Sequence, residues 1–312
     1  MTSKRKLNQV KVPAMLVCAA LILCRVVMAQ DIVTTAHKTS MELGAALSMP
    51  SDVGIGKDGR IYVVDGGNHQ VAVFDDLGAR VATLGARGSE EGQLESPVGL
   101  GVSRKGEVYV ADKGNQRLQV FSADGRFRRE IALQENGEEA DPVDVAVSAN
   151  GKELYVSVNN SHRILVFSAE GKYLRGWGGE GEDPGMFRYP ATIALDEDGN
   201  VLVVDVLNQR VQKFDPEGNL LLSFGKMGGK PGTFFRPKGI ALDSAGRIYV
   251  SDSYLGAIQV FDAAGEPLYV LGEGGETTVF DTPVGLAADG SRLLVVQMLV
   301  GNVFVLEMEP LP

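Results

Sequence analysis

Cysteine and histidine are scarce in this sequence, which has two cysteines and three histidines among its 312 residues. Both cysteines, Cys18 and Cys24, lie within the first 29 residues. The rest of the chain therefore has no disulfide bond, no cysteine-ligated zinc and no thiol nucleophile. It also lacks a nucleophile elbow, a glycine-rich phosphate loop before a helix and a metalloprotease helix. These absences exclude several motif-based enzyme classes, and we assign no catalytic residue.

The first 29 residues have the pattern of a secretory signal peptide. A basic front precedes a short apolar stretch, VPAMLVCAALILC. The sequence VMA that follows places small residues at the positions read by signal peptidase, which predicts cleavage before Gln30. We therefore expect a signal peptide over residues 1–29 and an exported protein, periplasmic or extracellular, over residues 30–312. The alternative is an uncleaved membrane anchor, although Arg25 interrupts the apolar stretch.

The chain is acidic. Removal of the five positive charges of residues 1–29 changes the formal net charge from −10 to −15. Such a charge repels phosphate backbones and excludes nucleic acid as the expected partner. It favours solubility and association with basic partners.

One sequence pattern recurs six times. A proline opens each copy, and the six are Pro50, Pro97, Pro142, Pro190, Pro237 and Pro283. The spacings between them are 47, 45, 48, 47 and 46 residues. In the first five copies, a glycine follows nine residues after the proline. Periods of about 40 to 50 residues indicate propellers, solenoids or arrays.

Each copy has the composition of four short strands. The fourth copy contains the apolar runs TIAL, VLVVD, RVQKF and LLLSF, separated by DEDGN, VLNQ and DPEGN. The runs have strand length, and the separators have the glycine, aspartate and asparagine typical of tight turns. No sustained 3.6-residue period is visible outside the first 29 residues. We therefore predict an all-β fold, a six-bladed β-propeller of four-stranded antiparallel blades.

The sixth copy is truncated, which predicts how the ring closes. It contains sequences for three strands and then ends near Pro312. The unassigned segment before Pro50, IVTTAHKTSMELGAALSM, is the available source of the missing strand. We expect it to pair as the outer strand of the last blade. A frayed N-terminus is the alternative.

The copies resemble the NHL repeat. The matching segments are PKGIALD, GRIYVSD, GGNHQVAVF, GNQRLQVF and LNQRVQKF, and the resemblance covers residues 50 to 308. It implies a propeller fold, and together with the predicted signal peptide and the acidic charge it makes the chain resemble the secreted bacterial NHL proteins. The Asp-x-x-Asn-x-Arg group of the repeat is complete at Asp112–Arg117 and Asp205–Arg210. Because each pair flanks one tight turn, we expect a local charge-assisted bond rather than catalysis.

The histidines do not reproduce a catalytic set. His69 and His162 occupy the repeat's own histidine position in the turns between second and third strands, and His37 lies in the predicted closing strand. Related propellers, the amidating and streptogramin lyases, use several histidines around the channel mouth. Two histidines on non-adjacent blades do not supply such a group.

Three oxygen-bearing side chains depart from the repeat at the channel mouth. The second residue after each opening proline is a glycine in three copies, but the others are Asp52, Asp144 and Thr192. Their oxygens, together with backbone carbonyls, are ligands suited to a hard cation such as Ca²⁺. The alternative is that both carboxylates are solvated or accept hydrogen bonds from nearby amides.

The loops between blades differ in length and charge, which points to binding. The acidic residues that we assign to partner binding are Glu135, Glu138, Glu139, Asp141, Glu180, Glu182 and Asp183. We expect an exported scaffold that binds a basic protein or small ligand through this loop face. The alternative is a propeller hydrolase or lyase with a metal-dependent site at the channel mouth.

Overall fold

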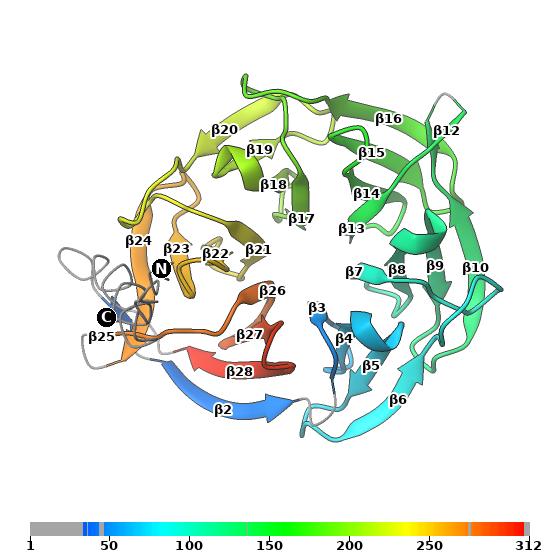
Figure 1. Ribbon diagram of the computed structural model, residues 1–312, viewed down its shortest axis with the longest axis horizontal. Helices are drawn as coiled ribbons and strands as arrows, with labels where there is room; N and C mark the ends of the chain where they lie inside the picture. Colours follow the sequence, from blue (N-terminus) through cyan, green and yellow to red (C-terminus); the bar gives the residue numbers. More distant parts are fainter. Residues whose placement is uncertain (1–33, 36, 44–46, 136, 274–275, 309–312) are drawn as a thin grey trace, which may run out of the picture.

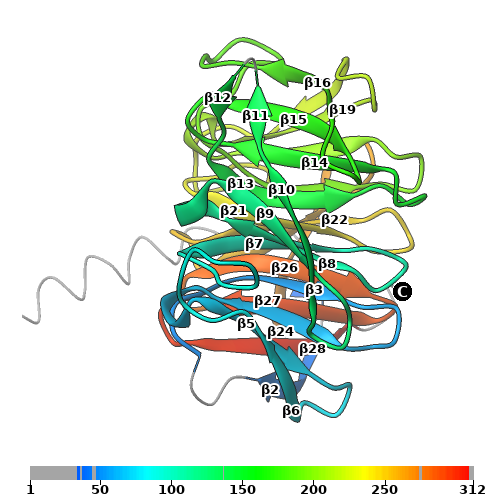
Figure 2. The same ribbon diagram turned by 90° about the vertical axis from the view of Figure 1, so that its right-hand side faces the viewer.

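The computed structural model describes residues 34–35, 37–43, 47–135, 137–273 and 276–308. The predicted signal peptide lies outside these ranges. Six sheets are arranged in a ring around a central axis (Figure 1), and the strands run from one face of the ring to the other (Figure 2). No helix within the described ranges is long and apolar enough to cross a membrane.

Blades 1 to 3 follow one another along the chain. Blade 1 consists of β3 (Pro50–Ile55), β4 (Ile61–Asp65), β5 (Gln70–Phe74) and β6 (Arg80–Leu84). Blade 2 consists of β7 (Pro97–Val102), β8 (Val108–Asp112), β9 (Arg117–Phe121) and β10 (Phe127–Ala132). Blade 3 consists of β13 (Pro142–Val147), β14 (Glu153–Val158), β15 (Arg163–Ser168) and β16 (Tyr173–Gly178). Between blades 2 and 3, β11 (Gln134–Glu135) and β12 (Glu138–Glu139) pair separately.

Blades 4 and 5 continue the pattern, and blade 6 uses both ends of the chain. Blade 4 consists of β17 (Pro190–Leu195), β18 (Val201–Asp205), β19 (Arg210–Phe214) and β20 (Leu220–Phe224). Blade 5 consists of β21 (Pro237–Leu242), β22 (Ile248–Asp252), β23 (Ala257–Phe261) and β24 (Pro267–Glu273). Blade 6 consists of β26 (Pro283–Asp289), β27 (Arg292–Gln297), β28 (Asn302–Met308) and β2 (His37–Leu43).

The N-terminal strand closes the ring, as the truncated sixth copy predicted. β2 pairs antiparallel with β28, with Leu43 opposite Val303 and Thr39 opposite Leu306. Figure 1 shows β2 lying along β28 at the outer edge of this blade. A further short strand, β1 (Thr34–Thr35), pairs parallel with β24 of blade 5. β2 therefore covers an edge of blade 6 that would otherwise be unpaired.

The ring has two different faces. The connections between blades and the turns between second and third strands share one face, here called the loop face: Glu95 N, in the connection to blade 2, donates to Asp112 at the turn of that blade. The hairpin between the first and second strands of each blade and the hairpin between its third and fourth strands lie on the opposite face, here called the hairpin face. There Arg60 Nη1 of blade 1 donates to Ala123 O of blade 2 at 2.8 Å.

A buried aspartate fixes most connections on the loop face. The residue that ends the second strand is fully buried in four blades, where it is Asp65, Asp112, Asp205 or Asp252. Each accepts a hydrogen bond from a backbone amide of the incoming connection, at 2.6 to 2.7 Å. In two blades an arginine completes the pair, with Nε–Oδ2 distances of 3.0 Å for Arg117–Asp112 and 2.8 Å for Arg210–Asp205. The predicted structural role of these two pairs is confirmed.

The core lies between adjacent sheets. β4, β8, β18 and β22 are buried at all five positions. In one cluster, Tyr62 and Val71 of blade 1 pack with Val108 and Phe121 of blade 2. Because a sheet is covered on both sides by its neighbours, these strands are continuous apolar runs rather than alternating ones.

Candidate functional site

Asp52 and Asp144 lie at the start of the innermost strands of blades 1 and 3. Their residues are 6% and 4% exposed, so both carboxyl groups are buried. Asp52 Oδ2 accepts a hydrogen bond from Leu100 N of blade 2 at 2.9 Å. Asp144 Oδ2 accepts one from Ile193 N of blade 4 at 2.8 Å. Each carboxyl group therefore joins its own blade to the next.

Glycines of the repeat leave room for these side chains. A Cβ atom at Gly99 would lie 2.7 Å from Asp144 Oδ1 and 2.4 Å from the Val143 carbonyl oxygen. A Cβ atom at Gly285 would lie 2.8 Å from Asp52 Oδ1. The close approach of neighbouring innermost strands thus requires glycine at these positions.

The two carboxyl groups also meet each other. The two groups interact electrostatically, so that ionisation of one carboxyl group opposes ionisation of the other. Burial, followed by repulsion from Asp144, raises the pKa of Asp52 well above its usual range. Burial also raises the pKa of Asp144, to about 6, against the hydrogen bonds from Ile193 and Val145. The pair is a buried acid that holds a proton into the weakly acidic range.

The third predicted cation ligand is directed elsewhere. Thr192 Oγ1 donates to the carbonyl oxygen of Lys238 in blade 5 at 2.6 Å. Within the described residues, no group of three or more His, Cys, Asp or Glu side chains is arranged to hold a metal ion. The structure thus brings two of the three predicted ligands together, and the cation site stays a prediction.

The described histidine side chains accept hydrogen bonds that hold the turns of the loop face in place. His69 Nδ1 accepts a hydrogen bond from Ser96 N, and His162 Nδ1 accepts one from Tyr189 N, both at 3.0 Å. Each histidine therefore ties a turn to the connection that leaves its blade. His37 lies in β2.

The predicted partner-binding acids divide into paired and unpaired groups. Glu135 pairs with Arg163 at 2.9 Å, and Glu182 pairs with Arg188 at 2.8 Å. Asp141 Oδ1 accepts a hydrogen bond from Gln116 at 2.6 Å. The other four are exposed and form no ion pair with any described residue, namely Glu138, Glu139, Glu180 and Asp183.

Exposed apolar side chains occupy another part of the loop face, which charge analysis missed. They belong to the connections and turns of blades 4 to 6, and the largest are Tyr189, Met227, Phe235, Tyr254 and Leu299. Phe235 and Tyr254 contact each other with ring centroids 5.3 Å apart.

Comparison with known proteins supports the repeat assignment. The sequence matches the family described as NHL repeat over residues 47–74, 94–121 and 234–261. It matches the family described as 6-bladed beta-propeller over residues 143–222. No curated protein matches the chain.

Solved propellers share the fold at low sequence identity. A protein of unknown function from Bacteroides thetaiotaomicron aligns with a TM-score of 0.66 and 16% identity, covering 90% of this chain and 76% of that one. Virginiamycin B lyase from Staphylococcus aureus aligns with a TM-score of 0.60 and 14% identity, covering 82% and 80%. A streptogramin B lyase aligns with a TM-score of 0.58 and 15% identity, covering 82% and 78%. The chain contains NHL repeats and folds as a six-bladed β-propeller.

Proposed function

We propose that this protein is an exported binding scaffold whose loop face docks a basic polypeptide. The observation that carries the proposal is the group of four unpaired acids, Glu138, Glu139, Glu180 and Asp183, on the connections around blade 3. Exposed acids without cationic neighbours produce a negative potential that steers a basic partner and makes its association dependent on salt.

The apolar part of the same face indicates the partner's second property. Met227 is 68% exposed and Tyr254 is 56% exposed, and the Phe235–Tyr254 contact presents aromatic area to solvent. Aromatic residues and methionine are enriched where proteins bind one another. A polypeptide that combines basic with apolar side chains fits this face better than a purely cationic one.

The scaffold is suited to binding because the loops are held in place before a partner arrives. The buried aspartates and the two histidines attach the connections to the blades through backbone hydrogen bonds. Fixed loops reduce the entropy lost on association.

The test is capture from the native exported fraction, followed by kinetics with the captured partner. The loop-face variant replaces Glu138, Glu139 and Glu180 by Gln and Asp183 by Asn. The control makes the same change of charge at exposed acids on the hairpin face, Asp76, Glu170, Glu217 and Glu266. We expect the loop-face variant alone to slow association and to flatten its salt dependence. Equal on-rates and salt slopes in the two variants would refute the docking face.

Export is tested separately. The N-terminus of the protein isolated from its native periplasm or medium is expected to be Gln30. Recovery of the uncleaved chain in the membrane fraction would favour the anchor instead.

The alternative, a hydrolase or lyase at the channel mouth, has one observation in its favour. The Asp52–Asp144 pair holds a proton, as acid–base catalysis requires. The described histidines do not assist it, because His69 and His162 are engaged by backbone amides.

A further inference from the structure

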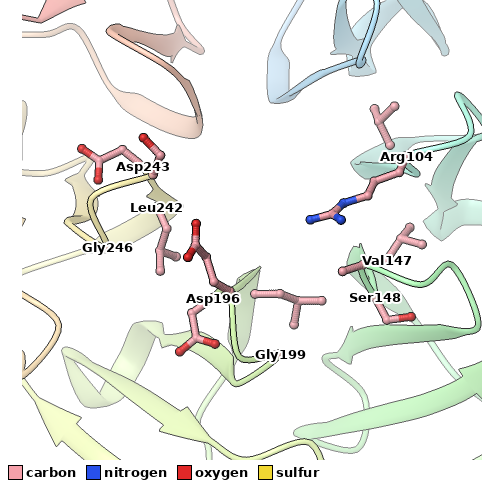
Figure 3. A pocket seen from close by; sticks show the side chains of 13 residues that line it. Arg104, Val147, Ser148, Asp196, Gly199, Leu242, Asp243 and Gly246 are labelled. Atoms are coloured by element: carbon pink, nitrogen blue, oxygen red, sulfur yellow. The ribbon is translucent and has the colours of Figure 1, made fainter.

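A cavity of about 370 Å³ lies on the hairpin face, where the innermost strands end. Blades 2 to 5 all contribute to it. Figure 3 shows the Arg104 side chain reaching into the cavity from one side, with Asp196 and Asp243 on the other. The volume is within the range of small-ligand sites.

An apolar collar lines the cavity. It consists of the last residue of four innermost strands, Val102, Val147, Leu195 and Leu242. All four are half-buried and line the cavity. Contact with a ligand would remove this apolar surface from water, at roughly 25 cal/mol per Å².

The charged groups around the collar are of two kinds. Asp196 is compensated by Lys213 at 2.8 Å, and Asp243 by Arg247 at 2.5 Å. Arg104 and Glu197 are exposed and have no ion pair within the described part of the chain. An uncompensated positive charge, Arg104, therefore lies on blade 2, and an uncompensated negative charge, Glu197, lies on blade 4.

The positive side is reinforced by its neighbours. Lys57 and Arg104 line an adjoining cavity of about 220 Å³ between blades 6, 1 and 2, whose acidic residue, Asp289, is compensated by Arg292 at 2.8 Å. Asp198, next to Glu197 on blade 4, is exposed as well. The end of the channel is therefore basic on blades 1 and 2 and acidic on blade 4, with the apolar collar between.

We propose that this cavity binds a small zwitterion with an apolar body, of the size of an apolar dipeptide with free termini. The carboxylate meets the Arg104 guanidinium, which is suited to bidentate pairing. The ammonium meets the Glu197 carboxylate, and the apolar side chains contact the collar.

The test uses the dipeptide Leu-Leu and two blocked forms, its N-acetyl and its C-terminal amide derivative, followed by calorimetry or NMR titration. We expect each block to weaken binding to the wild-type protein about tenfold or more, the loss of one charge-assisted interaction. Arg104→Gln should bind the free and amidated peptides equally, and Glu197→Gln should bind the free and acetylated peptides equally.

The control variant is Lys105→Gln, which makes the same change of charge one residue from Arg104. Lys105 lines a different cavity, with Glu107 and Arg129. This variant should behave as the wild type. Absence of binding to the wild-type protein would overturn the proposal, as would binding that acetylation leaves unchanged or that Lys105→Gln weakens as much as Arg104→Gln.

Discussion

The carboxyl group of Asp144 acts on that of Asp52 and raises its pKa, although their blades, the third and the first, are not adjacent in the ring. Blade 2 lies between them, and its Gly99 has no side chain to keep them apart. The two aspartates connect blades 1 to 4 through their contacts with Leu100 and Ile193. Two buried carboxyl groups thus take part in contacts that span four blades.

The raised pKa values of the two carboxyl groups make stability depend on pH. Because the folded pKa values are raised, the folded state holds a proton that the unfolded chain releases. The contribution of Asp144 is complete below the unfolded pKa and is lost as the pH rises through its folded pKa of about 6; the contribution of Asp52 is lost as the pH rises through its own raised pKa. We expect the loss to be on the order of 2–3 kcal/mol.

The Asp52→Asn variant tests this expectation. Its amide donates to Asp144 without a titrating proton, so its melting temperature should fall less than that of the wild type between about pH 5 and about pH 8. Asp76→Asn, at an exposed position, is the control and should keep the wild-type pH dependence. A contribution of Asp52 to the pH dependence is excluded if Asp52→Asn loses as much stability over this range as the wild type.

Calcium binding is a second way, besides protonation, to compensate the negative charges of Asp52 and Asp144. At neutral pH, saturating Ca²⁺ should raise the melting temperature if it binds the ionised carboxylates of Asp52 and Asp144 in the folded state alone. A concentration of 100 times Kd corresponds to about 2.7 kcal/mol. The gain should disappear in the Asp52→Asn, Asp144→Asn double variant. A melting temperature that does not change during calcium titration would eliminate the site.

Removal of the closing strand should destabilise the ring. Deletion of residues 30–43 exposes the edge of β28 and removes Leu43, which is 1% exposed, from the core between blades 6 and 1. Leu43→Ala alone should cost about 2–5 kcal/mol of unfolding free energy. Glu42→Gln, in the same strand, is the control. Denaturant unfolding measures the loss, and an unchanged midpoint in the deletion variant would show that β2 does not stabilise the ring.

The buried aspartates of the loop face should be costly to remove. Asp205→Ala leaves Arg210 without its partner and the Arg188 amide without its acceptor, and we expect a loss of about 3–5 kcal/mol. Asp198→Ala, at an exposed hairpin position, should cost less than about 0.5 kcal/mol. Thermal unfolding of the two variants gives the comparison, and similar losses would contradict the structural role of Asp205.

Local sequence was sufficient to predict the strands and turns of each blade. The turns depend on residues that are close in the chain: Gly199 and Gly218 adopt φ values of 85° and 94°, and Asp196 accepts a hydrogen bond from Asn200 N. The period of the prolines gave the number of blades, and the truncated sixth copy gave the closing strand. These features could be predicted because each is set by contacts within one repeat, or by a missing strand that one segment could supply.

Contacts between blades were decided by the tertiary structure. The sequence singled out Asp52 and Asp144, but only the curvature of the ring brings them together across Gly99. The same holds for the loop-face acids, where Arg163 and Arg188 neutralise Glu135 and Glu182 but no described residue neutralises Glu138. Arg104 lies in a hairpin of blade 2, and only the closed ring places it on the same cavity as the collar and Glu197 of blade 4. A repeat determines its own strands through local hydrogen bonds and apolar spacing, whereas pairing between charges depends on distances that only ring closure sets.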